Sequence, residues 1–326
     1  MDLSPLVAGL KADNLAAFVG AGASRSYTDP DTGIQHPGLP AAGEIVAGLA
    51  KTRAYIPSSS SFPEACFLLK KRESRAKLEE VLVGFLGQNV PAPLPAYEML
   101  ASLPFAAFLT TNYDVLLETA LGKAQRSLHP VVEDKDVCHL RSKHVPVIKI
   151  HGCVSRPPTM IAAEDEYRPL SATKPLIEAL VKTQLANRVL LFLGFSLTDV
   201  DFRIAYQAVR DILGDRMPRS FAVVHSALPY EKELWESRGV QIVESDLTRF
   251  LFALWRAVAT EDHVMKLGAG EDERNDAVFR TLYDIGSRPS ETQLYRRVLG
   301  SPHGVHAKAP TRGGLRASHG DGRRPA

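Results

Sequence analysis

The chain has 326 residues, of which 45% are hydrophobic and 23% charged, enough apolar material for one large or two modest domains with a buried core. Its 39 basic and 37 acidic side chains leave a net charge of +2, which gives no reason to expect direct nucleic-acid binding or a membrane surface. Its three cysteines form no Cys-x-x-Cys pair, and the longest apolar run covers only residues 189–195, which predicts a reduced cytoplasmic protein without structural zinc or a membrane span.

Five short apolar runs along the chain end in polar or glycine-containing turns. They lack the polar alternation of a half-exposed sheet, and most precede a helical pattern, which is typical of buried parallel strands. The runs cover residues 15–19, 105–109, 145–150, 189–193 and 221–224. They predict an α/β fold built on a Rossmann-like, doubly wound parallel sheet.

The first two of these runs are separated by more chain than a plain loop requires. Helical periodicity in residues 41–50, 64–70 and 76–86 predicts that residues 41–100 form a small helical subdomain inserted into the sheet domain. The last residues are rich in Gly, Pro, His and Arg, a composition typical of disorder. The expected division is a domain over residues 1–262, a helical segment over 263–300 and a disordered basic tail over 301–326.

Small residues follow the first predicted strand directly. They are Gly20, Ala21, Gly22, Ala23 and Ser24. Without bulky side chains the backbone can approach a pyrophosphate, whose charge is attracted by the N–H groups at the start of the next helix. Arg25 occupies the third glycine position of a G-x-G-x-x-G motif, and short Gly-Ala clusters also form plain strand-to-helix turns.

Thr111, Asn112 and Asp114 lie at the carboxyl end of the second predicted strand. Open α/β sheets bind ligands at that end, and an amide two residues from a carboxylate can orient hydroxyls or a water molecule. Asp114 is also in position to cap a helix over residues 115–121. Capping and ligand binding are compatible at this position.

A histidine and a glycine-serine pair end the third and fourth of these strands. His151 leaves an apolar strand just before Gly152. Imidazole titrates near neutral pH, so this histidine is a candidate base, although a lone histidine is more often structural. Gly194 and Ser196 follow the next strand, where the serine hydroxyl could hydrogen-bond a phosphate or a ribose.

Taken in this order, the four motifs resemble those of the sirtuin family. Residues 20–24 are similar to its glycine-rich loop, 111–114 to T-x-N-x-D, His151 to its catalytic histidine and 194–197 to G-(T/Y/F)-S-L. Residues 38–40 (Gly-Leu-Pro) and 164–167 (Glu-Asp-Glu-Tyr) are further points of similarity. The resemblance covers roughly residues 10–250 and implies an NAD-binding catalytic domain.

Two departures narrow this resemblance. Protein-deacylating sirtuins carry two zinc-binding Cys-x-x-Cys pairs and an Asp-Phe-Arg after the proline, where this sequence has no such pair and reads Ala41-Ala42-Gly43. The pattern is more similar to divergent bacterial sirtuin-like domains of antiphage defence. It implies a metal-free NAD+ hydrolase that works as a homo-oligomer and/or with a partner defence protein such as a HerA-type ATPase or an Argonaute.

The resemblance also implies a role for each motif. Asn112 and His151 would be catalytic, with Asn112 orienting water or ribose hydroxyls and His151 accepting a proton from a ribose hydroxyl. Residues 20–23 would hold the pyrophosphate, Asp114 the nicotinamide side, and Ser196 a phosphate or ribose. The other residues expected to bind NAD are Ser24, Thr111 and Gly194. The alternatives are an NAD-dependent protein deacylase or ADP-ribosyltransferase, and a non-catalytic NAD or ADP-ribose sensor or scaffold subunit.

Overall fold

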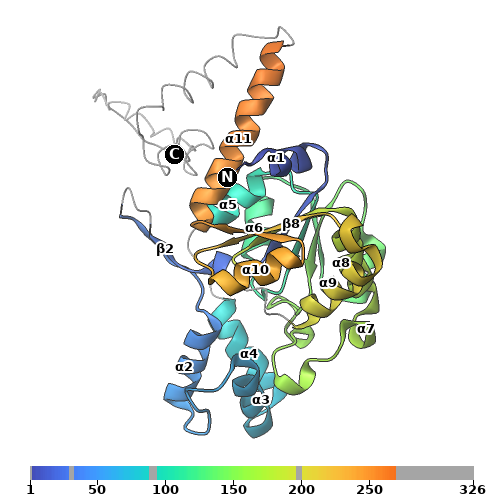
Figure 1. Ribbon diagram of the computed structural model, residues 1–326. Helices are drawn as coiled ribbons and strands as arrows, with labels where there is room; N and C mark the ends of the chain where they lie inside the picture. The colour runs from blue at the N-terminus through green and yellow to red at the C-terminus, as the bar shows by residue number, and fades with distance from the viewer. Residues whose placement is uncertain (1, 29–32, 88–93, 196–199, 269–326) are drawn as a thin grey trace, which may run out of the picture.

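The computed structural model describes residues 2–28, 33–87, 94–195 and 200–268. Within these residues, seven parallel strands form one sheet in the order β5-β6-β4-β1-β7-β8-β9 (Figure 1). The order turns at β1, which pairs with β4 on one side and with β7 on the other. The predicted Rossmann-like α/β class is confirmed. The strands of this sheet are β1 (Leu15–Val19), β4 (Ala107–Thr110), β5 (Leu128–Val131), β6 (Val145–Lys149), β7 (Val189–Leu193), β8 (Ser220–Val224) and β9 (Val240–Glu244).

Helices cover both faces of the sheet because its strands alternate between two hydrophobic cores. In β1, Leu15, Ala17 and Val19 belong to one core, together with side chains of α1, α5, α6 and α11. Ala16 and Phe18 belong to the other core, together with side chains of α7 to α10. The helices are α1 (Ser4–Lys11), α5 (Pro95–Ser102), α6 (Leu116–Lys123), α7 (Leu170–Thr173), α8 (Pro175–Asn187), α9 (Val200–Leu213), α10 (Pro229–Ser237) and α11 (Leu247–Gly268).

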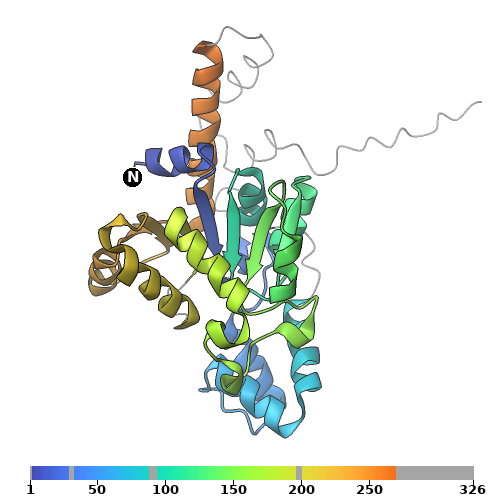
Figure 2. The ribbon, with the colours of Figure 1, turned by 90° about the vertical axis from the view of Figure 1, so that its right-hand side faces the viewer.

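Three helices between β1 and β4 pack around a third core. They are α2 (Ala42–Thr52), α3 (Phe62–Arg72) and α4 (Arg75–Leu86). A capping box begins α3, since the Ser61 hydroxyl accepts the Glu64 N–H and the Glu64 carboxylate accepts the Ser61 N–H. Figure 2 shows β1, β4 and β6 pointing toward these helices, so this helical insertion faces the carboxyl edge of the sheet.

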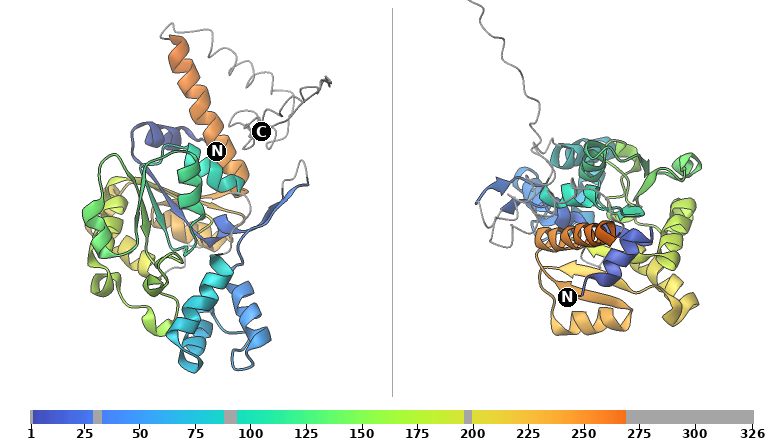
Figure 3. Two further views of the ribbon diagram at one scale, coloured as in Figure 1. Left: turned by 180° about the vertical axis from the view of Figure 1, so that it is seen from behind. Right: turned by 90° about the horizontal axis from the view of Figure 1, so that it is seen from above.

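The helical insertion is tied to the segment that follows His151. Val154, Met160 and Ala162 of that segment contribute to the third core. Lys70 of α3 and Arg75 of α4 both form ion pairs with Glu166, at 3.1 and 3.0 Å. Seen from behind in Figure 3, α11 projects from the opposite end of the molecule.

Two edge strands were not predicted from the sequence. β5 contains a histidine and a proline, and β9 is interrupted by Gln241 and ends on Glu244, so neither gives the continuous apolar run of a buried strand. Proline is tolerated in β5 because this strand lies at the edge of the sheet. In addition, β4 begins at Ala107, two residues after the predicted start.

The remaining short elements lie in the connections. They are the paired antiparallel strands β2 (Tyr27–Thr28) and β3 (Gln35–His36) and the 3₁₀ turns η1 (Ala21–Ser24), η2 (Asp134–His139), η3 (Pro157–Thr159), η4 (Glu164–Glu166) and η5 (Gly214–Arg216). At the other end of the chain, α11 crosses the domain boundary expected at residue 262. The tail over residues 301–326 lies outside the described residues.

Candidate active site

The ends of β1 and β7 approach each other where the strand order turns. The Gly20 N–H donates to the Leu193 carbonyl at 2.9 Å, and the Gly22 N–H donates to the Gly194 carbonyl at 2.8 Å. A Cβ on Gly194 would lie 2.3 Å from the Ala23 nitrogen, and Gly194 has φ +62°, which side chains rarely tolerate. Packing alone therefore requires glycine here, at the position where doubly wound sheets bind their ligands.

The residues after Gly20 form one 3₁₀ turn, η1, rather than the expected start of a helix. The Ala23 N–H donates to the Gly20 carbonyl at 3.0 Å, and Arg25 has an extended backbone. A phosphate at this turn would meet the backbone of one short turn and the nearby Arg25 guanidinium. It would not gain the dipole of a long helix. The prediction of a helix N-terminus at this position is wrong.

A cavity of about 710 Å³ lies along the carboxyl ends of β1, β7, β8 and β9. Four residues singled out in the sequence line it, namely Ala21, Gly22, Thr111 and Gly194. Its wall also includes Arg25, His225, Glu231, Trp235 and Asp246. The volume suits a drug-sized or cofactor-sized ligand. Except for Arg25, these wall residues were missed, because β8, α10 and the start of α11 converge on the cavity only in the folded chain.

Asn112 and Asp114 follow Thr111 in the loop between β4 and α6, and both of their side chains are buried. Thr110 fixes the start of the loop, since its hydroxyl donates to the Val19 carbonyl at 2.7 Å and accepts the Asn112 N–H at 2.9 Å. The Asp114 carboxylate accepts the first N–H of α6, that of Leu116, at 3.0 Å, but it does so from one residue before the N-cap, which is Val115. The helix begins one residue later than predicted.

Ser24, Tyr97, Asn112 and Asp114 form a buried polar network. The Ser24 hydroxyl donates to Asp114 Oδ2 at 3.0 Å, so in its 2.7 Å contact with Tyr97 it is the acceptor. The Asn112 Nδ2 group donates to Ser24 Oγ and to the Tyr97 hydroxyl, at 3.3 and 3.4 Å. This leaves the Asn112 Oδ1 atom on the opposite side of the amide. Tyr97 was missed in the sequence because it comes from α5.

Burial dominates the electrostatics of this network. It raises the pKa of the Asp114 carboxyl, an effect that the nearby Lys149 cation opposes. It also raises the pKa of the Tyr97 hydroxyl well above its usual range, and the Asp114 charge adds to that shift. Tyr97 therefore stays a neutral hydrogen-bond donor, and Asp114 is more easily protonated than an exposed aspartate.

His151 follows β6, the strand next to β4. Its side chain is 4% exposed, and Tyr167 meets it edge-on with ring centroids 5.5 Å apart. The next residue, Gly152, has φ +90°, and a Cβ there would lie 2.2 Å from the Thr159 carbonyl oxygen. The exit from this strand thus depends on glycine, as the sequence suggested.

Tyr113 joins the segment that carries Asn112 to the segment that carries His151. Its hydroxyl donates to the Ile161 carbonyl at 2.6 Å, and its carbonyl accepts the Val154 N–H at 2.8 Å. The Ile161 N–H in turn donates to the His151 carbonyl at 2.9 Å. The structure therefore brings the two predicted catalytic residues to neighbouring strand ends and fixes their segments to each other.

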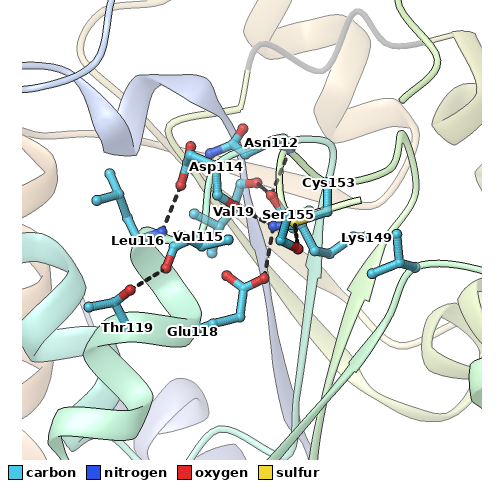
Figure 4. Close-up of polar contacts among 12 residues, drawn as sticks. Val19, Asn112, Asp114, Val115, Leu116, Glu118, Thr119, Lys149, Cys153 and Ser155 are labelled. Carbon is cyan, nitrogen blue, oxygen red and sulfur yellow. Dashed lines mark hydrogen bonds and ion pairs between the residues drawn. The ribbon is translucent and has the colours of Figure 1, made fainter. Parts of the chain in front are cut away.

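Lys149, two residues before His151, was also missed in the sequence. Figure 4 shows its amino group between the Asp114 loop and Glu118 of α6. It donates to Glu118 Oε1 at 2.9 Å and to the Asp114 backbone carbonyl.

Ser196, which was expected to contact a phosphate or ribose, lies outside the described residues. Within the described residues, no cluster of three or more His, Cys, Asp or Glu side chains could hold a metal ion. No helix of the described residues is long and apolar enough to cross a membrane.

Comparisons with known proteins agree with this geometry. The family model of the SIR2-like domain matches residues 106–243. "Defense-associated sirtuin 2" of Bacillus subtilis is 26% identical over 157 residues, which are 46% of this chain and 16% of that protein. "NAD(+) hydrolase ThsA" of Bacillus cereus (strain MSX-D12) is 26% identical over 73% of this chain and 50% of its own length.

A further relative, "NAD(+) hydrolase ThsA" of Acinetobacter baumannii (strain 532279), is 31% identical over 45% of this chain and 30% of its own length. The chain thus spans no more than half of the length of each of these curated relatives. The sheet order and the polar residues at the carboxyl edge are consistent with the match of residues 106–243 to a SIR2-like domain.

Proposed function

We propose that this chain is a cytoplasmic NAD+ hydrolase that releases nicotinamide and ADP-ribose as an effector of antiphage defence. The observation that carries the proposal is the placement of Asn112 and His151 at the ends of the neighbouring strands β4 and β6. Thr111, which precedes Asn112, lines the cavity together with Ala21 and Gly22 of the glycine turn, residues 20–24. The names of its relatives, NAD(+) hydrolase and defense-associated sirtuin, support the same activity and setting.

The cavity supports binding of the adenosine diphosphate half of NAD+. Ala21, Gly22 and Gly194 offer a wall without bulky side chains, and Arg25 supplies a cation for the diphosphate. Trp235 offers an apolar surface, while Glu231 and Asp246 offer carboxylates to sugar hydroxyls. The nicotinamide end would then extend past Thr111 toward the buried polar network. Ser196 is assigned to a phosphate or ribose of this ligand.

The reaction needs positioning more than strong acid catalysis. Nicotinamide leaves NAD+ as a neutral molecule, because the bond that breaks ends on a positively charged ring nitrogen. Water attacks the ribose carbon and loses one proton, so NAD+ and water give nicotinamide, ADP-ribose and a proton. Asn112 Oδ1 orients the water or a ribose hydroxyl, His151 accepts the proton of a ribose hydroxyl, and Asp114 fixes the nicotinamide side.

The polar network supports this role for Asn112. The Nδ2 atom of its amide donates to both Ser24 and Tyr97, so the side chain is held in one orientation before a ligand binds. Uncontrolled NAD+ loss would harm the host cell. We therefore include in the proposal a gate, supplied by homo-oligomerisation or by a partner defence protein.

The test is chromatography of NAD+ and its products, with wild-type protein and the variants Asn112→Ala and His151→Ala. Each variant is expected to lose about 10²- to 10⁴-fold in kcat while keeping the wild-type melting temperature within a few degrees. The matched controls are Asn187→Ala and His139→Ala, since both of those side chains are exposed, and they should turn over NAD+ at the wild-type rate.

Product identity separates this proposal from the alternatives. With an acetyl-lysine peptide present, hydrolysis gives ADP-ribose alone, whereas deacylation gives acetyl-ADP-ribose. Lysate from phage-infected cells is added in a parallel set to supply a missing activator. Saturable NAD+ binding without any product in either set would favour a sensor, and near wild-type turnover by Asn112→Ala or His151→Ala would remove that residue from the mechanism.

A further inference from the structure

Lys149 is a fully buried lysine in the middle of the domain. It is the last residue of β6, and its side chain is 1% exposed. Burying an ammonium group away from water costs several kcal/mol unless partners replace its hydration. Two partners do so, Glu118 and the backbone carbonyl of Asp114. Burial lowers the pKa of Lys149, but the Glu118 and Asp114 carboxylates outweigh this effect and raise it overall.

The ion pair between Lys149 and Glu118 leaves one of its buried polar atoms without a hydrogen bond in the described part of the chain. Within the described residues, the second carboxylate oxygen of Glu118 is buried without a hydrogen-bond partner. Replacing a buried ion pair with apolar side chains of similar volume is often neutral or stabilising. The contribution of this pair to stability therefore gives a weak reason for placing a lysine here, and its contact with the Asp114 carbonyl needs a separate explanation.

The contact with Asp114 lies at the point where the candidate site is assembled. The Asp114 side chain is held by Ser24 on one oxygen and by the Leu116 N–H on the other. Lys149 holds the backbone of the same residue from the neighbouring strand. Because Lys149 also precedes His151 by two residues, one side chain links the loop that carries Asn112 to the chain that carries His151.

We propose that Lys149 is a positioning residue that sets the Asn112–Asp114 loop against His151 through its hydrogen bond to the Asp114 backbone carbonyl, with Glu118 as a second partner of its amino group. The proposal rests on the hydrolase function proposed above. It assigns Lys149 no contact with the substrate. Loss of this link should misplace Asn112 and lower kcat more than it changes KM, since a shift of about 1 Å in reacting groups can cost 10²-fold in rate.

The test compares Lys149→Met with the double variant Lys149→Met/Glu118→Leu. Three readouts are taken for each protein: the melting temperature, the hydrogen exchange of the amides in residues 111–116, and kcat and KM for NAD+. The single variant leaves Glu118 buried and unpaired, so it should lose melting temperature and kcat together. The double variant should regain the melting temperature but keep fast exchange in the loop and about a 10- to 100-fold loss of kcat.

Two further variants keep this test decisive. Lys77→Met removes one partner of the exposed Lys77–Glu80 pair and should match wild type in all three readouts. Glu118→Gln leaves the contact between Lys149 and Asp114 in place, so it should lose melting temperature while loop exchange stays at the wild-type level. Fast loop exchange in Glu118→Gln, equal to that of Lys149→Met, would overturn the proposal even if the double variant does not fold.

Failure of this proposal can be told apart from failure of the proposed function. A double variant with wild-type loop exchange and wild-type kcat would show that the buried pair is structural only. If wild-type protein turns over no NAD+, the hydrolase function fails, but loop exchange still decides whether Lys149 orders residues 111–116. Slow exchange in Lys149→Met would then contradict the positioning role.

Discussion

The glycine turn and the buried polar network both lie at the carboxyl edge of the sheet. They differ in which parts of the chain form them, backbone in the first and polar side chains in the second. The turn consists of backbone and small residues, and it borders an open cavity together with Gly194 and Arg25. The network consists of side chains from η1, α5 and the loop after β4, and its members are at most 8% exposed. We interpret the first region as the binding half of the site and the second as the catalytic half.

This difference determines how each half should respond to substitution. The glycine turn should lose stability when a side chain is added, because the ends of β1 and β7 already touch. A side-chain network fails when a group is removed, because its partners lose hydrogen bonds that water cannot replace.

Adding a methyl group at the junction of β1 and β7 should have the largest effect on stability. Gly194→Ala meets both the strain of φ +62° and the Ala23 nitrogen, which together should cost about 3–5 kcal/mol in the free energy of unfolding. Gly214 is the matched control, since its φ is +55° but nothing lies near its Cβ position. Gly214→Ala should cost only about 1–2 kcal/mol. Urea unfolding measures both, and equal losses would show that the strand ends do not touch.

Removing one hydroxyl from the polar network should have a medium effect. Ser24→Ala leaves Asp114 Oδ2 and the Tyr97 hydroxyl without their shared partner, which should cost about 1–3 kcal/mol. It should also lower kcat, because Asn112 loses one of its two anchors. Ser237→Ala, at an exposed serine whose hydroxyl donates to the Leu234 carbonyl of the same helix, should change neither quantity. A Ser24→Ala variant with wild-type stability and kcat would contradict the network.

The pH dependence of stability gives the smallest expected effect. The folded-state pKa of Asp114 is raised by burial, so the folded chain holds this proton more tightly than the unfolded chain, whose aspartates titrate near about 3.9. The free energy of unfolding therefore falls as pH rises from the unfolded-state pKa to the raised folded-state pKa of Asp114. Asp114→Asn removes the titration, so its stability relative to wild type should improve as pH rises above about 4. A relative loss over that range would mean that the pKa is lowered instead.

The same contrast explains what the sequence could and could not predict. The five apolar strands and the glycine turn are local patterns, and the polar residues Asn112, Asp114 and His151 follow strands directly, so strand ends alone brought them to one edge. Tyr97 and Lys149 gave no local signal, because a helical tyrosine and a strand lysine become site residues only through packing. The edge strands β5 and β9 were missed for a related reason, since pairing on one side leaves little trace in composition.

The division of labour between the two halves can be measured with one pair of variants, Arg25→Met and Asn112→Ala. The readouts are kcat for NAD+ and the dissociation constant for ADP-ribose, which binds without being consumed. Arg25→Met should weaken binding by about tenfold and leave kcat near wild type, whereas Asn112→Ala should lower kcat by about 10²-fold or more and leave binding near wild type. The opposite pattern, or parallel losses of kcat and binding in both variants, would contradict the separation of a binding half from a catalytic half.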